Sequence, residues 1–298
     1  MRNAFCQSLV AHAESREFVF LTGDLGYLAL EPLRDALGTR FINAGVAEQN
    51  MVSVAAGLAR QGLRPWAYSI APFIFARPFE QIRNDVCLHG LPVVMVGNGG
   101  GYGYGVMGST HHALEDYGSL LTLSGLRVWI PAFDADVAAV IAQLMVSNGP
   151  AYLRLGLSEE PKGWTPPPFA AWRKLVAGEC STIIAVGPLA GSVWQACAEL
   201  PENSRPNLWC LSELPLGELP DELLADIQNT AVLCVAEEHV AQGGVGSMLA
   251  AELLARGSIP QRFVQRTALG YPSGRYGSQK FHRRECGLDA AALLEAVC

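Results

Sequence analysis

The chain contains no long hydrophobic run and no basic cluster, and its first residues do not resemble a signal peptide. No apolar stretch reaches the roughly 18 residues that a membrane-spanning helix needs, and the first residues contain no apolar signal region. Only 16% of its 298 residues are charged, the net charge is -7, and no basic cluster is present. These absences argue against a membrane or a nucleic acid as a partner, and we expect a cytoplasmic protein.

The cysteines form no C-x-x-C pair and no metal-ligand spacing. They lie far apart, at Cys6, Cys87, Cys180, Cys197, Cys210, Cys234, Cys286 and Cys298. This spacing predicts reduced, mainly structural thiols. Half of the residues are hydrophobic, and the length suits two α/β domains with large subunit contacts.

Short apolar runs alternate with helical patterns, which is typical of a parallel sheet covered on both faces. The predicted strands are residues 18–21, 65–70, 92–96, 127–130, 151–155, 181–186, 207–211 and 231–237. The predicted helices are residues 46–61, 79–88, 136–146, 193–200 and 245–255, with Asp134 as the N-cap of the third. A proline-rich stretch, residues 160–168, separates two predicted three-layer α/β domains at residues 1–165 and 172–298.

Glu48 is a carboxylate at the start of a predicted helix whose other face is apolar. Apolar residues recur at spacings of three and four from Val46 to Leu58, so the helix packs against a core. Such a glutamate can simply complement the helix N-terminus, or it can be a buried functional group. The segment alone leaves both interpretations open.

Two further segments follow predicted strands, where open α/β sheets build their sites. The first carries Phe73 and Phe75, which could stack on a flat ring or fill the core. The second is rich in glycine from residue 97 to residue 108 and ends in His111 and His112. Adjacent histidines face different ways, which favours a hydrogen-bond donor or proton carrier over a metal ligand.

Several short motifs stand in a fixed order along the chain. They are Ala47-Glu48-Gln49, Phe73 ahead of Gln81-Ile82-Arg83, Gly108-Ser109-Thr110-His111, Arg154, Glu237-Glu238 before Gln242-Gly243-Gly244-Val245-Gly246-Ser247, and Cys286-Gly287-Leu288-Asp289. In this order they resemble the transketolase family over essentially the whole chain, as the C-terminal half or as the corresponding subunit of a split transketolase. The resemblance implies a thiamine-pyrimidine-binding domain at residues 1–165 and a transketolase C-terminal-like domain with a mainly parallel sheet at residues 172–298.

The resemblance also implies thiamine diphosphate as the cofactor. Glu48 would hydrogen-bond the ring nitrogen of the aminopyrimidine, and a buried carboxylate suits that role. Phe73, helped by Phe75, would supply the face on which the pyrimidine stacks. Asp24 matches an aspartate that lines the cofactor cavity.

For the substrate, the resemblance implies transfer of a two-carbon ketol unit from a ketose to an aldose. His111 would bond substrate oxygens and carry protons, and Arg154 would bind a substrate phosphate. Met107 and Gly99 stand where the family usually has an aspartate and a histidine. Because both polar side chains are missing, we expect a deoxygenated or otherwise modified sugar.

The chain lacks the family's motif for Mg²⁺ and diphosphate, Gly-Asp-Gly followed later by Asn. Gly23-Asp24-Leu25 has leucine in place of the final glycine, so no metal ligand is predicted in this chain. The resemblance therefore implies an N-terminal, diphosphate-binding partner subunit that holds Mg²⁺, with two copies of each chain. A 2-oxoacid dehydrogenase β subunit, a deoxyxylulose-phosphate synthase-like enzyme and a non-catalytic partner subunit remain as alternatives. Residues 271–281 suggest no chemistry.

Overall fold

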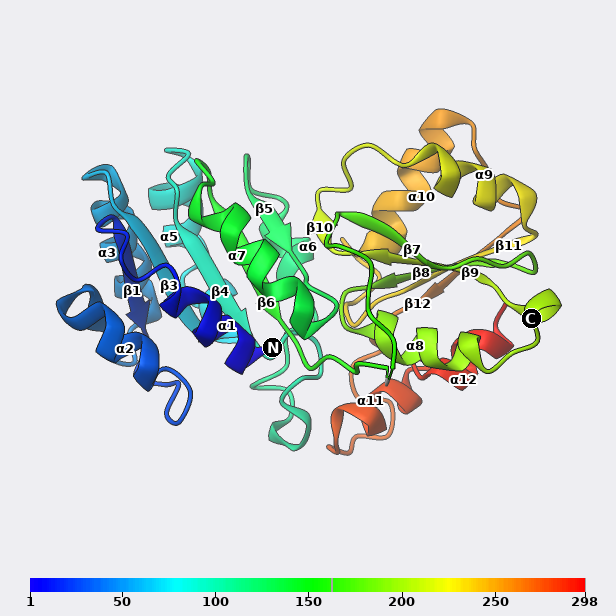
Figure 1. Ribbon diagram of the computed structural model, residues 1–298, viewed down its shortest axis with the longest axis horizontal. Coiled ribbons are helices and arrows are strands. Elements are labelled where there is room, and N and C mark those ends of the chain that lie inside the picture. The colour runs from blue at the N-terminus through cyan, green and yellow to red at the C-terminus, as the bar shows by residue number, and fades with distance from the viewer. Residues whose placement is uncertain (162, 298) are drawn as a thin grey trace.

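The residues that the structure describes form two sheets, one of seven strands and one of five, with helices on their faces (Figure 1). The computed structural model describes residues 1–161 and 163–297. The prediction of an α/β fold with two parallel-sheet domains is confirmed. No helix in this described part is both long and apolar enough to cross a bilayer.

The first sheet has the strand order β10-β5-β6-β4-β3-β1-β2, and every pairing is parallel except that of β10 with β5. Its strands are β1 Phe18–Thr22, β2 Phe41–Asn43, β3 Arg64–Ile70, β4 Val94–Asn98, β5 Arg127–Trp129, β6 Ala151–Leu155 and β10 Glu213–Leu214. Parallel strands covered on both faces are apolar throughout, and every residue of β1 and β6 is buried.

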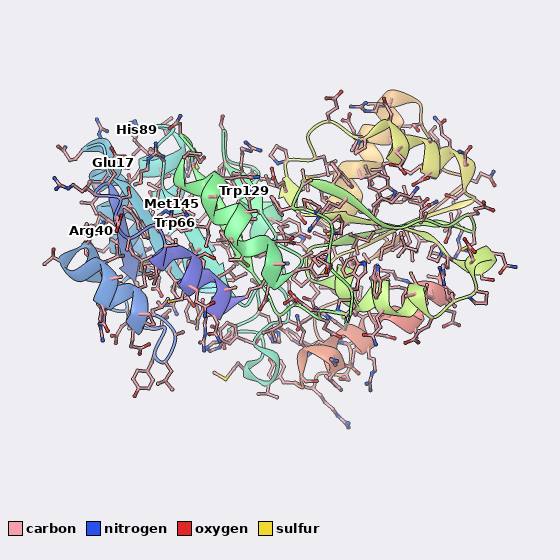
Figure 2. All side chains as sticks on the ribbon, viewed as in Figure 1. Glu17, Arg40, Trp66, His89, Trp129 and Met145 are labelled. Carbon is pink, nitrogen blue, oxygen red and sulfur yellow. The ribbon has the colours of Figure 1, made fainter. Side chains whose placement is uncertain are left out.

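Alternate residues of these strands enter two separate cores. Phe18, Trp66 and Trp129 belong to one core together with Met145, on the face of α1 Arg2–Val10, α2 Glu31–Leu37 and α7 Val137–Met145 (Figure 2). The opposite face packs against α3 Glu48–Arg60, α4 Ala71–Phe75, α5 Phe79–Gln81, the π-helix η2 Ile82–Cys87 and α6 Asp116–Leu120. Short 3₁₀ turns are η1 Gly38–Arg40, η3 Gly105–Met107, η4 Asp134–Asp136 and η5 Glu202–Ser204.

The second sheet has the order β12-β11-β8-β9-β7 and is parallel except for β7, which runs antiparallel to β9. Its strands are β7 Trp172–Val176, β8 Thr182–Val186, β9 Asn207–Leu211, β11 Val232–Ala236 and β12 Arg262–Arg266. Helices α8 Leu189–Ala198 and α12 Ala290–Glu295 contribute to one core. Helices α9 Asp221–Asn229 and α10 Val245–Arg256 join the core shared with the first sheet, and α11 is Gln279–Glu285.

The predicted strands are all present, and the largest shift places residues 92–96 at Val94–Asn98. The helix predicted at residues 79–88 is instead a short α-helix followed by a π-helix. The prediction that Asp134 caps α7 is wrong. Asp134 begins η4, its carboxylate accepts from Ser158, and Asp136 accepts the backbone N–H groups of Ala132 and Phe133. The domain boundaries at 165 and 172 stay predictions.

A buried ion pair joins the two sheets. Both guanidinium Nη atoms of Arg173, on β7, lie 2.7 Å from the carboxylate oxygens of Asp136, before α7. Both side chains are nearly inaccessible to solvent. Asp136 also accepts from two backbone N–H groups. Its removal would therefore leave the buried Arg173 cation without its counter-ion and two buried donors without partners.

We expect Asp136→Ala to lower the free energy of unfolding by about 3–5 kcal/mol, because it removes one partner of a buried ion pair and leaves the other charge buried. Urea denaturation followed by circular dichroism measures this loss. Glu252→Ala, which breaks the half-exposed pair with Arg256 on α10, is the matched control and should cost less than about 1 kcal/mol. Equal losses for the two variants would contradict the importance of the buried pair.

Candidate active site

Glu48 lies over the carboxyl ends of two central strands. Its side chain is only 3% exposed, although it belongs to the first residue of α3. The hydroxyl of Ser69, in β3, donates to Glu48 Oε1 at 3.3 Å. Gly23, directly after β1, faces the same oxygen, and a Cβ there would lie 3.6 Å from it. The carboxyl edge of the sheet is where open α/β folds place their sites.

Arg77 occupies the space between Glu48 and Phe73. Its Nη1 donates to both carboxylate oxygens, at 3.0 and 2.9 Å, and its guanidinium lies 3.8 Å from the Phe73 ring centroid. The Arg77 side chain is 44% exposed, whereas the carboxylate is buried. A carboxylate and an aromatic face therefore form a slot that accepts a flat, cationic N–H donor.

His111 closes the same site from the loop that follows β4. Its ring meets the Phe73 ring edge-on, with centroids 5.3 Å apart, and lies 5.8 Å from the Tyr104 ring. Thr110 Oγ1 is 2.8 Å from His111 Nδ1. The structure thus brings together Glu48, Phe73 and His111 at one edge of the sheet, from the start of α3, from α4 and from the loop after β4.

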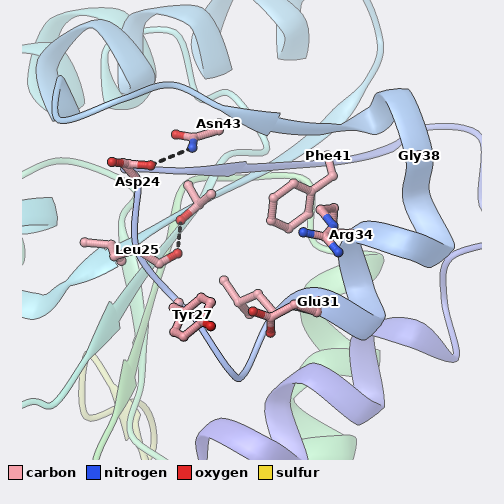
Figure 3. A pocket seen from close by; sticks show the side chains of 11 residues that line it. Asp24, Leu25, Tyr27, Glu31, Arg34, Gly38, Phe41 and Asn43 are labelled. Carbon is pink, nitrogen blue, oxygen red and sulfur yellow. Dashed lines mark hydrogen bonds between the residues drawn. The ribbon is translucent and has the colours of Figure 1, made fainter.

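Phe75 and Asp24 lie apart from this group. Phe75 is buried in the core, because residues two apart on a helical turn point in nearly opposite directions. Asp24 is exposed, has a left-handed backbone (φ 56°) and accepts from Asn43 Nδ2 at 2.8 Å (Figure 3). It lines a cavity of about 560 Å³ that is formed by β1, β2, α2 and the connecting loop.

Met107 and Gly99 belong to the glycine-rich loop that carries His111. Met107 ends η3 and is 54% exposed. Gly99 has φ +75°, and a Cβ at this position would overlap the ring of Tyr104. Tyr104 therefore fills the space that a larger side chain at position 99 would occupy, which explains why a histidine would not fit here without rearrangement.

Arg154 lies inside the protein, between the two sheets. Its Nε donates to Asp116 at 2.7 Å, and its Nη2 donates to the carbonyls of Ala113 and Glu238, each at 2.9 Å. The side chain is 4% exposed. This placement does not suit the predicted role in binding a substrate phosphate, and we assign Arg154 no substrate contact.

The sequence interpretation gave no role to Arg77, Ser69 or Tyr104. Arg77 had a usable signal, because it follows Phe73 by four residues and such pairs share one face of a helical turn. Ser69 and Tyr104 had none, since only the folded sheet brings them to the site. Within residues 1–161 and 163–297, no group of three His, Cys, Asp or Glu side chains is arranged to hold a metal ion.

Comparison with known proteins places this chain in one family. The model of the family "Transketolase, pyrimidine binding domain" matches residues 1–160. An apulose-4-phosphate transketolase subunit of Actinobacillus succinogenes is 29% identical over 272 residues, which cover 86% of this chain and 83% of that protein. The 1-deoxy-D-xylulose-5-phosphate synthase of Magnetococcus marinus is 32% identical over 263 residues, 85% of this chain but only 41% of the synthase.

Solved structures of transketolases also resemble this chain. A split-gene transketolase, described as an inactive β4 tetramer, superposes with a TM-score of 0.82 at 29% identity and covers 99% of this chain and 96% of that one. The transketolase from Leishmania mexicana shares the fold, with a TM-score of 0.76 at 17% identity over 44% of its length. Fold and motif order together define a transketolase-type α/β protein. The chain belongs to the transketolase family, as the counterpart of its C-terminal half.

Next to His111, His112 is held in a different way. It is 4% exposed, its Nε2 lies 2.9 Å from the carbonyl of Gly105, and its Nδ1 lies 2.8 Å from the hydroxyl of Tyr271. Burial lowers the pKa of His112 to about 4. A neutral ring that donates from Nε2 and accepts at Nδ1 satisfies both contacts.

We expect His112 to make the protein acid-sensitive. Between about pH 6.5 and pH 4 the unfolded chain binds a proton at this residue and the folded chain does not. The free energy of unfolding therefore decreases as the pH is lowered through this range. Over this range the wild type should lose up to about 3 kcal/mol more than His112→Gln, as measured by urea unfolding at several pH values. His89→Gln, at an exposed histidine, is the control; parallel curves for wild type and His112→Gln would contradict the expectation.

Proposed function

We propose that this chain is the C-terminal subunit of a split, thiamine diphosphate-dependent transketolase. In this proposal the assembled enzyme transfers a two-carbon ketol unit from a ketose to an aldose, and one of the two is a modified sugar. The observation that carries the proposal is the meeting of Glu48, Phe73 and His111 at one edge of the sheet. Membership of the transketolase family supports it.

The slot between Glu48 and Phe73 fits an aminopyrimidine. The Arg77 guanidinium already occupies it as a planar cation that donates N–H bonds to the carboxylate and stacks on the ring. An aminopyrimidine presents the same combination of a flat face and nitrogen donors. Because Arg77 is nearly half exposed, it can move aside while Glu48 and Phe73 keep their places.

Each side chain then has a distinct task. Glu48 would hold a proton between its carboxylate and the ring nitrogen of the pyrimidine, an interaction that low dielectric strengthens. Phe73 would orient the ring by stacking. The bond from Thr110 to His111 Nδ1 leaves Nε2 to exchange a proton with a substrate oxygen. When bound, thiamine diphosphate supplies a carbon nucleophile and an electron sink.

The proposal requires a second chain for the diphosphate and Mg²⁺. The described residues offer no metal-binding group, so an N-terminal, diphosphate-binding subunit would hold both, in an assembly with two copies of each chain. Tyr27, Leu28 and Val46 are more than 70% exposed and stand next to Asp24 and Glu48 in the sequence. An apolar partner surface over these side chains would complete the site. The Actinobacillus succinogenes relative, which is itself named as one subunit of a transketolase, supports this arrangement.

The substrate proposal depends on Met107 and Gly99. A half-exposed thioether in η3 offers no hydrogen bond to a sugar hydroxyl, and Gly99 lies beneath the Tyr104 ring. A sugar that has no hydroxyl near this position, or carries it on another carbon, would fit better than an ordinary ketose phosphate. Apulose 4-phosphate, named in the relatives, is the first donor to test.

A synthase of 1-deoxy-D-xylulose 5-phosphate type is the second candidate, because such synthases match 84–90% of this chain at 30–34% identity. The two activities differ by one oxygen atom in the ketose product. Mass spectrometry of the product formed by the reconstituted enzyme separates them. Absence of any product with either donor class would favour a non-catalytic subunit.

We expect Glu48→Gln to lower turnover of the reconstituted complex at least about 100-fold, because an amide cannot hold the proton that a carboxylate holds. Steady-state kinetics with apulose 4-phosphate or xylulose 5-phosphate as donor measures this loss. Circular dichroism and size-exclusion chromatography check that the variant folds and assembles. Glu252→Gln, on the surface of α10, is the control.

Near-complete activity of Glu48→Gln would contradict the catalytic assignment. The cofactor assignment has its own test, by calorimetry with thiamine diphosphate and Mg²⁺. We expect binding to the two-chain complex and none to this chain alone. Tight binding by the isolated chain would contradict the need for a partner.

We expect Met107→Asp to shift donor preference toward xylulose 5-phosphate, relative to apulose 4-phosphate, by about tenfold in kcat/KM. The new carboxylate supplies an acceptor for a sugar hydroxyl, which is worth about 1–3 kcal/mol. Competition between the two donors, with ribose 5-phosphate as acceptor, measures the shift. Met107→Leu is the control, and an unchanged preference in Met107→Asp would make Met107 a packing residue only.

A further inference from the structure

Residues 271–281 comprise an irregular segment after β12 and the first residues of α11, and the proposed function leaves them without a role. Although the segment belongs to the second half of the chain, it lies against the loop between β4 and α6. Figure 1 shows α11 beside this loop, at the end of the molecule where the strands of the first sheet terminate. The segment is rich in exposed residues, yet two of its tyrosines make specific contacts with the loop.

Tyr276 contacts the loop two and three residues before the candidate catalytic histidine, His111. Its hydroxyl lies 3.0 Å from Ser109 Oγ. Its ring covers Gly108, where a Cβ would stand 2.7 Å from the nearest ring atom. Gly108 also has φ +77°, a backbone conformation that other residues rarely adopt. Glycine therefore allows both the turn and the close approach of the tyrosine.

Tyr271 holds the loop on the other side of His111. Its hydroxyl lies 2.8 Å from His112 Nδ1, and the two rings stack with centroids 5.7 Å apart. Tyr271 and Tyr276 also meet each other edge-on at 5.1 Å. The two tyrosines thus fix Ser109 and His112, the residues two before and one after His111.

This support matters because a glycine-rich backbone has much conformational freedom that contacts must restrict. Five glycines lie between residues 99 and 105, and each leaves the backbone more conformational freedom than another residue would. The side chain of His111 is bonded to Thr110 of the same loop and packs edge-on against Phe73. Neither contact by itself fixes the backbone that carries the imidazole.

We propose that Tyr276 is a positioning residue, which holds the loop through Ser109 and Gly108 so that the His111 imidazole stays beside Phe73. The second half of the chain therefore takes part in forming the active site. The inference rests on the proposed function for its effect on turnover, but the effect on His111 itself does not depend on that function.

Tyr276→Phe and Tyr276→Ala test the proposal in two steps. Phenylalanine keeps the ring over Gly108 and loses only the hydroxyl, and alanine loses both contacts. In the isolated subunit, NMR signals of the His111 imidazole, assigned with His111→Gln, should shift in Tyr276→Phe and broaden or shift further in Tyr276→Ala. Ser109→Ala should reproduce the Tyr276→Phe shift, and the double variant should add nothing to it.

In the reconstituted complex, kcat should fall about fivefold in Tyr276→Phe and about 100-fold in Tyr276→Ala, because small displacements of a catalytic group cost rate. The donors are apulose 4-phosphate and xylulose 5-phosphate, with ribose 5-phosphate as acceptor. The concentration of thiamine diphosphate for half-maximal activity should stay unchanged. Ser273→Ala is the matched control, because its hydroxyl bonds Glu285 within the second half of the chain.

Two results would overturn the proposal. One is an unchanged His111 signal in Tyr276→Ala, and the other is a shifted signal with wild-type kcat. Thermal unfolding identifies any variant that fails to fold, and in that case Tyr276→Phe and Ser109→Ala carry the test. If the wild-type complex shows no activity with these sugars, the proposed function fails while the NMR comparison still decides whether Tyr276 positions His111.

Discussion

Arg154 is the charged group around which both halves of the molecule are joined. It stands on β6, a central strand, where a guanidinium is almost completely removed from water. Burial works against the charged form, but Asp116, 2.7 Å away, outweighs this and raises the pKa of Arg154 above its ordinary value. The Nη2 group donates to the carbonyls of Ala113 and Glu238. One cation therefore fixes both the end of the His111 loop and the segment that follows β11 in the second sheet.

The candidate site depends on this connection, because its members come from separate segments. Glu48 and Phe73 are placed by α3 and by the turn after β3, which are parts of one rigid sheet. His111 instead comes from a loop that is held at Ala113 by Arg154 and at His112 by Tyr271. The carboxylate and the aromatic ring are thus fixed by the fold of the first half, and the loop that carries the imidazole is held by contacts with both halves.

Sequence reasoning predicted the repeated strands and long helices well, because their periodicity reflects burial on two faces of a sheet. It located Glu48 through the apolar periodicity of the helix that Glu48 begins, and the Phe73 turn through the buried strand before it. It did not show that Arg154 points between the sheets, because the motif records a residue type and not the direction of a side chain. Phe75 was predicted to act with Phe73 because the two are close in sequence. They lie in one helical turn, which points Phe75 into the core and away from the Phe73 ring. The contacts of residues 271–281 depend on long-range packing, which leaves no local pattern.

Strand β10 has a mechanical consequence. Glu213 and Leu214, from the second half of the chain, pair through their backbones with β5 at the edge of the first sheet. A hinge between the two sheets would have to break these hydrogen bonds together with the buried pair of Arg173 and Asp136. Such an opening would separate a buried ion pair and unpair two strands, so it is costly in free energy. Ligands of the candidate site therefore reach it without any separation of the two halves, past the nearly half-exposed side chain of Arg77.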